Sequence, residues 1–195
     1  MVQIARLGAA GFFVQSAQFE IDKWASASSP PNLRDINRVA RYYSASFRYA
    51  ADNPWALEGI GALDLAIMRA SKVPQEAQSA TRNGHRRFRQ ALIQRPTSPF
   101  LWANVALAKL YLDEIDADFM AALRHADELG PWEPAVQQTI LFVGLAACIP
   151  PAGRPTGTHS GNGRVMMLPE QRDLVLATAA HEVAAIFLLS FSLKF

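Results

Sequence analysis

The chain has 195 residues, half of them hydrophobic, and a formal net charge of +2 at pH 7. This length allows one domain with a sizeable core, and the apolar content argues against a disordered chain. Because 19 basic residues nearly balance 17 acidic ones, we expect no nucleic-acid partner. The single cysteine, Cys148, excludes an internal disulfide, and no Cys/His spacing indicates a metal site.

The first predicted element lies in residues 4–14, which are apolar except for Arg6. This stretch is shorter than the about 20 residues that cross a bilayer. Two interpretations stay open. The stretch is either the remnant of a signal or anchor segment, which would allow membrane association through a terminus, or a first helix that packs on the elements after it.

An internal repeat follows, in three segments that align without gaps at residues 46–54, 91–99 and 126–134. The second and third share an alanine and two prolines, whereas the first keeps only its last proline and has Ser46 and Ala51 at the other two places. The final prolines are 45 and 35 residues apart, and the second spacing is close to the period of about 34 residues known for one class of helical repeat. We interpret residues 71–76 as a loop insertion that lengthens the first spacing.

Proline and small residues give this repeat a physical meaning. A small residue lets two helices approach closely, and a proline ends a helix because it lacks an N–H and clashes with the preceding turn. The last proline of each segment suits the first turn of the next helix, with Asn53 and Ser98 as natural N-caps. The sequence therefore predicts helix pairs joined at Pro54, Pro99 and Pro134.

Apolar residues at helical spacing predict the helices themselves. The first helix of each pair is expected at residues 57–68, 100–112 and 135–147, and the partner helices at residues 33–50, 80–95 and 116–129. Asp116 is the expected cap of the last partner helix, and the acidic turn that leads to it lacks the glycine and distal glutamate of a calcium loop.

Over residues 33–147 this pattern resembles the tetratricopeptide-repeat superfamily. The matching residues are Trp102, Val105 and Ala106 in the first helix of a pair and Phe88, Ala91 and Pro96 in the second. The tyrosine usual in the first helix is absent, with Asp64 and Lys109 near its place. The resemblance implies an all-α solenoid of antiparallel helix pairs, with about three to four degenerate repeats and a C-terminal capping helix.

Two strings, at residues 98–109 and 130–134, are similar to those of repeat proteins encoded with bacterial polysaccharide biosynthesis and export genes, the VpsP-like group. This narrower resemblance implies a membrane-associated accessory role in exopolysaccharide assembly. It favours the bacterial envelope, at the inner membrane or in the periplasm, over the cytoplasm.

The remaining chain departs from the repeat, so we divide the single domain into residues 1–147 and 148–195. Residues 150–163 are expected to form a loop and residues 170–189 a closing helix. His181 and Glu182 lie near the middle of the apolar residues 174–193, where a bilayer would make them costly, so a buried cap is favoured over a membrane span. The two also lack the second histidine of a zinc peptidase, because Ala185 occupies that position.

A stack of helix pairs leaves a concave groove that binds partner segments. By repeat position, the candidate groove residues are Trp55, Glu58, Phe100, Ala103, Asn104 and Gln138. Arg82, Arg86 and Arg89 share one side of a predicted helix, and we interpret them either as a site for an anionic partner or as an ordinary solvated face.

The sequence thus predicts a scaffold that binds a protein or peptide segment, not an enzyme. No nucleophile–base order, phosphate loop, paired catalytic carboxylates or cofactor motif stands out. The alternative is a hydrolase or glycan-modifying enzyme with a helical-toroid body, for which Glu58, Asp64 and His85 are the candidate residues. No pattern specifies the oligomeric state.

Overall fold

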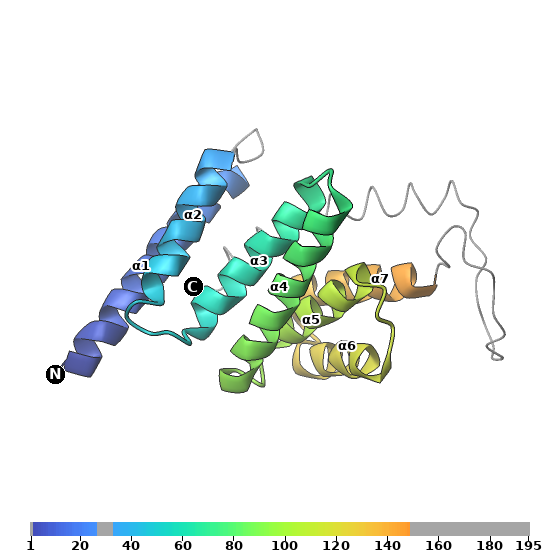
Figure 1. Ribbon diagram of the computed structural model, residues 1–195. Coiled ribbons are helices and arrows are strands. Elements are labelled where there is room, and N and C mark those ends of the chain that lie inside the picture. Colours follow the sequence, from blue (N-terminus) through green and yellow to red (C-terminus); the bar gives the residue numbers. More distant parts are fainter. Residues whose placement is uncertain (1, 27–32, 149–195) are drawn as a thin grey trace.

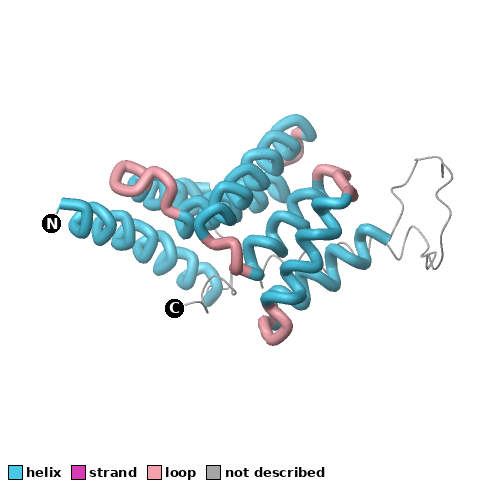
Figure 2. Tube along the Cα trace, turned by 90° about the horizontal axis from the view of Figure 1, so that it is seen from below, coloured by secondary structure: helices cyan, strands magenta, loops and turns pink. Residues whose placement is uncertain are grey.

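The computed structural model describes residues 2–26 and 33–148, which form seven α-helices and no strand (Figures 1 and 2). The helices are α1 (Val2–Ser26), α2 (Leu33–Ser46), α3 (Pro54–Ala70), α4 (Pro74–Gln94), α5 (Pro99–Tyr111), α6 (Ala117–Leu129) and α7 (Pro134–Cys148). The predicted all-α class is confirmed. The expected loop and closing helix after residue 148, with His181 and Glu182, lie outside the described residues.

Proline sets the start of three helices as the sequence predicts, because α3, α5 and α7 begin at Pro54, Pro99 and Pro134. Asn53 caps α3, and its Oδ1 accepts the backbone N–H groups of Trp55 at 3.1 Å and Ala56 at 3.4 Å. The N-cap position predicted for Ser98 is confirmed. Ser98 occupies the N-cap position of α5, but its side chain makes no capping hydrogen bond.

Two helix boundaries differ from the prediction. The segment at residues 71–76 is not a loop insertion, because α4 begins at Pro74 and runs for 21 residues. A proline in the first turn and an acidic residue, Glu76, close behind it favour a helix start here. The longer spacing between Pro54 and Pro99 therefore comes mostly from longer helices, α3 and α4, and not from a longer loop. At the other boundary, α2 ends at Ser46, four residues before the expected end.

The helices pair in sequence order, α1 with α2, α3 with α4 and α5 with α6, and α7 packs on α5 (Figure 1). The apolar N-terminal stretch belongs to α1, which buries Ala10, Val14, Ala17 and Ile21 along one side. Among the described helices, none is both long and apolar enough to cross a membrane.

Two main hydrophobic clusters fill the interior. One joins α1 and α2 to α3 and includes Val14, Val39 and Tyr43. The other joins α3 through α7, with Phe88, Leu101 and Phe119 among its members. Both clusters take residues from α3, so this helix links the first hairpin to the later ones.

Candidate functional site

An open cleft of about 440 Å³ lies where the start of α3, the α4–α5 turn and the α6–α7 turn meet. Its lining combines aromatic, proline and polar side chains: Trp55, Gln94, Arg95, Pro96, Thr97, Ser98, Pro99, Phe100, Leu129 and Glu133. A second hollow of about 360 Å³, at the other end of the α3–α4 hairpin, is lined by uncharged residues and contains none of the predicted site residues. The first cleft is therefore the stronger candidate.

Local capping places the aromatic wall of the cleft. Because Asn53 caps α3 and Pro54 is its first residue, Trp55 lies in the first turn. The Arg95 guanidinium stacks on its ring, with Cζ 3.5 Å from the ring centroid. Such a cation–aromatic contact favours a fixed orientation of both groups.

Two further side chains, Glu58 and Ser98, bind the Arg95 guanidinium. Its Nη1 donates to Oε2 of the fully buried Glu58 at 2.6 Å, and its Nη2 donates to Oγ of Ser98 at 3.3 Å. A buried carboxylate needs such a partner, since a charge without one is costly to desolvate. The Arg95 guanidinium therefore contacts the Trp55 ring, and its charge is compensated by the buried carboxylate of Glu58.

The α4–α5 turn, which contains Arg95 and Ser98, also contributes Pro96 and Thr97 to the lining. Trp102 Nε1 donates to the carbonyl oxygen of Pro96 at 2.7 Å, which ties the turn to the second turn of α5. Phe100, half-buried, follows directly after the helix start at Pro99. Trp132, which precedes the cleft residue Glu133 in the α6–α7 turn, is 91% exposed but does not line the cleft.

The predicted groove residues divide between the cleft and other places. Trp55 and Phe100 both line the cleft, and Gln138 is exposed on α7 but does not line it. Glu58, Ala103 and Asn104 differ from the expectation, because they are 0%, 3% and 4% exposed and lie in the interior. Glu58 does not line the cleft itself, but it binds Arg95, which does.

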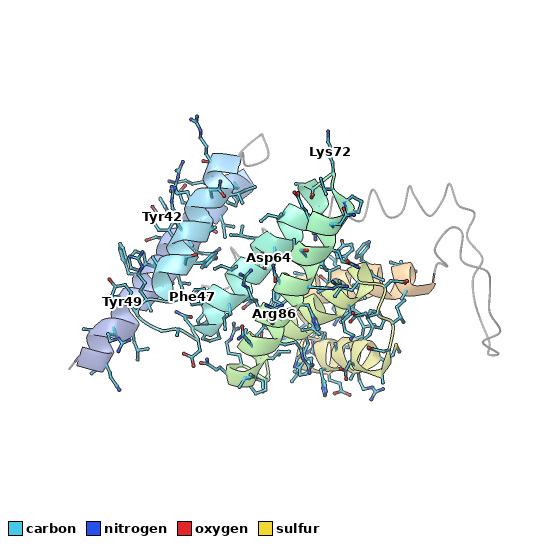
Figure 3. The ribbon with its side chains drawn as sticks, in the orientation of Figure 1. Tyr42, Phe47, Tyr49, Asp64, Lys72 and Arg86 are labelled. Atoms are coloured by element: carbon cyan, nitrogen blue, oxygen red, sulfur yellow. The ribbon has the colours of Figure 1, made fainter. Side chains whose placement is uncertain are left out.

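Arg82, Arg86 and Arg89 lie on α4 and all three are exposed, as expected for either interpretation of the cluster. Figure 3 labels Arg86 on this helix and Asp64 on the neighbouring α3. None of the three arginines lines the cleft, so they form a separate surface.

The residues considered for an enzyme site have other partners. Asp64 pairs with Arg87, and Glu58 pairs with Arg95. Burial raises the pKa of Asp64, against the opposing effect of Arg87. Burial lowers the pKa of His85, and the nearby Lys109 lowers it further. Within residues 2–26 and 33–148, no three or more His, Cys, Asp or Glu side chains are placed to hold a metal ion.

Arg95, Leu129 and Glu133 are cleft residues that the sequence pattern did not indicate. Arg95 ends a helix beside a proline, where a basic residue is ordinary, and its acidic partner lies 37 positions earlier in the chain. No local spacing marks such a pair. Of the three, Leu129 has a sequence feature that could have indicated an exposed apolar position: it is the last residue of α6 and directly precedes Gly130. It is 40% exposed.

Searches of protein-family models, of curated proteins and of solved structures find no match to this chain.

Proposed function

We propose that the chain is a scaffold that binds an extended segment of a partner protein in the cleft lined by Trp55 and Phe100. The observation that carries the proposal is the cleft itself, with two aromatic rings, an oriented Arg95 and prolines around an open hollow of about 440 Å³. Aromatic and arginine side chains dominate the binding energy of many protein interfaces. Aromatic-lined grooves are also a common way to bind extended peptides.

The finer part of the proposal is that α3–α4 and α5–α6 are tetratricopeptide-like repeats. Three features support it. The small residues of the repeated segments, Ser46, Ala91 and Ala126, are all 0% exposed, as close helix approach requires. The prolines that follow begin α3, α5 and α7. Each partner helix packs on the first helix of its own pair, and α4 also packs on α5.

A role in bacterial exopolysaccharide assembly is the narrowest form of the proposal. It is supported by the resemblance of residues 98–109 and 130–134, which include the cleft residues Ser98, Pro99, Phe100 and Glu133. Deletion of the gene in its host should then lower the amount of secreted polysaccharide. Unchanged secretion would remove this part and leave the scaffold proposal in place.

The enzyme hypothesis has less support. Both of its candidate carboxylates are engaged by arginines, and a general acid or base needs to reach a substrate proton.

Peptide selection tests the scaffold proposal and does not require the natural partner to be identified. Random peptides displayed on phage are selected on the wild-type chain, and their affinities are then measured for two double variants. Trp55→Leu with Phe100→Ser should weaken binding about tenfold or more, as expected for aromatic hot spots. Phe12→Leu with Phe19→Ser, which alters two exposed aromatics of α1, should leave it unchanged.

Thermal melting of both variants checks that the fold is retained. If the selected peptides bind the cleft variant as tightly as the α1 variant, or if no peptide is selected, the cleft is not the binding site.

A further inference from the structure

The outer face of α4 carries a stripe of three arginines that ends in an apolar side chain. Arg82, Arg86 and Arg89 are spaced four and three residues apart, which places them on one side of the helix. Ile93 follows four residues later on the same side and is 81% exposed. At 1.5 Å per residue, the stripe is about 16 Å long. We refer to these four residues as the α4 stripe.

The three arginines of the stripe have no carboxylate partner among the side chains that the structure describes. None of them forms an ion pair with any residue in the described part of the chain, whereas Arg87 on an adjacent side of α4 pairs with Asp64. Glu76, the acidic residue in the first turn of α4, accepts a hydrogen bond from Ser71 at 3.2 Å. The helix therefore presents three positive charges without a negative charge among them.

Acidic groups of the following turn do not compensate these charges by contact. Glu114 and Asp116 lie close enough to act on His85, which precedes Arg86. However, both are bound by Lys109, whose Nζ is 3.4 Å from Glu114 Oε2 and 2.9 Å from Asp116 Oδ2. The charges of the stripe are therefore not compensated by contact with these two acidic side chains.

The shape of the stripe favours a flat partner. No stripe residue lines either of the two hollows described above, so nothing there would hold an extended acidic peptide in a groove. Guanidinium groups bind phosphate oxygens in pairs of hydrogen bonds, and an exposed isoleucine at the end of a basic helix face suits the boundary between headgroups and acyl chains. We propose that the α4 stripe binds the surface of an anionic phospholipid membrane, with the arginines on phosphates and Ile93 inserted.

Vesicle sedimentation tests this proposal. The full chain is mixed at low ionic strength with vesicles of phosphatidylglycerol and phosphatidylcholine, and with vesicles of phosphatidylcholine alone. The stripe variant combines Arg82→Gln, Arg86→Gln and Arg89→Gln. The control variant combines Arg41→Gln, Arg48→Gln and Arg124→Gln, which removes the same charge from three exposed arginines outside the stripe.

The wild type should bind the anionic vesicles and not the neutral ones, and added salt should release it. The stripe variant should bind on the order of 100-fold more weakly, since each of the three basic residues near an anionic surface contributes a factor of about five. The control variant should keep most of the binding. Absence of wild-type binding, or equal losses in the two variants, would overturn the proposal.

Ile93→Ser separates a membrane from a soluble acidic partner. This variant should weaken binding to anionic vesicles, because the inserted side chain is lost, and should leave binding to polyglutamate unchanged. If polyglutamate binds through the stripe while vesicles do not, the surface serves an acidic polypeptide and the membrane proposal is wrong. Circular dichroism melting confirms that every variant is folded.

Discussion

Glu58 was expected to line the groove, but the structure places its side chain in the interior. A glutamate on a helix is most often exposed, so its repeat position suggested a place in the groove. In the structure it is 0% exposed and pairs with Arg95, which in turn stacks on Trp55. Removing Arg95 would take this ion pair from the buried carboxylate of Glu58, so the pair connects the stability of the fold to the geometry of the cleft.

Tyr43 allows a prediction at the same scale. Its side chain is fully buried, and its hydroxyl has no hydrogen-bond partner among the described residues. Burial raises the pKa of this phenol above its ordinary range, and Glu58 and Asp22 raise it further, so the group stays neutral. Because a buried polar group without a partner is unfavourable, Tyr43→Phe should raise the free energy of unfolding by about 1 kcal/mol.

Urea denaturation measures this change, with Tyr49→Phe as the control. Tyr49 is 38% exposed and stacks on Phe13, so loss of its hydroxyl should change stability by less than about 0.5 kcal/mol. A Tyr43→Phe variant less stable than the wild type would show that the hydroxyl makes a stabilising interaction.

At the scale of the elements, close packing depends on glycine as well as on the small residues of the repeat. Gly61 of α3 faces Phe88 of α4, and a Cβ at this position would lie 2.7 Å from Cε1 of the phenylalanine ring. Phe88 is itself fully buried and has little room to move. The close approach of α3 and α4 therefore requires glycine at this position, although glycine has a low helix propensity.

Paired substitutions test this requirement. Gly61→Ala should lower the free energy of unfolding by about 1–3 kcal/mol, because the added methyl overpacks the helix interface. Gly8→Ala, at an exposed α1 position with nothing within 4 Å of the new methyl, should raise it by up to about 1 kcal/mol through helix propensity. Chemical denaturation measures the free energy of unfolding of each variant and shows whether it falls or rises. Stabilisation by Gly61→Ala would mean that the α3–α4 spacing adjusts easily.

At the scale of the whole molecule, burial is uneven along the chain. The side chains of residues 103–109 in α5 are all buried, with α4, α6 and α7 packed around them. Residues 3–8 at the start of α1 are all exposed, and α1 packs mainly on α2. Local opening requires less free energy where fewer contacts are lost.

Hydrogen exchange followed by mass spectrometry should therefore show a gradient. Backbone amides of α5 should exchange most slowly among the described helices, and those in the first two turns of α1 most rapidly. The amides near Ile21 of α1, which is buried, provide an internal comparison within the same helix. Equal protection of α1 and α5 would indicate that the molecule opens as one cooperative unit.

The amino-acid sequence by itself determined the helical class and the starts of α3, α5 and α7, because apolar periodicity and proline act over a few residues. It also identified Trp55 and Phe100, which line the cleft. Tertiary structure alone decided the burial of Glu58 and Asn104 and the pairing of Glu58 with Arg95. The physical reason is that desolvation and ion pairing depend on neighbours brought together by packing, and residues 37 positions apart show no local pattern.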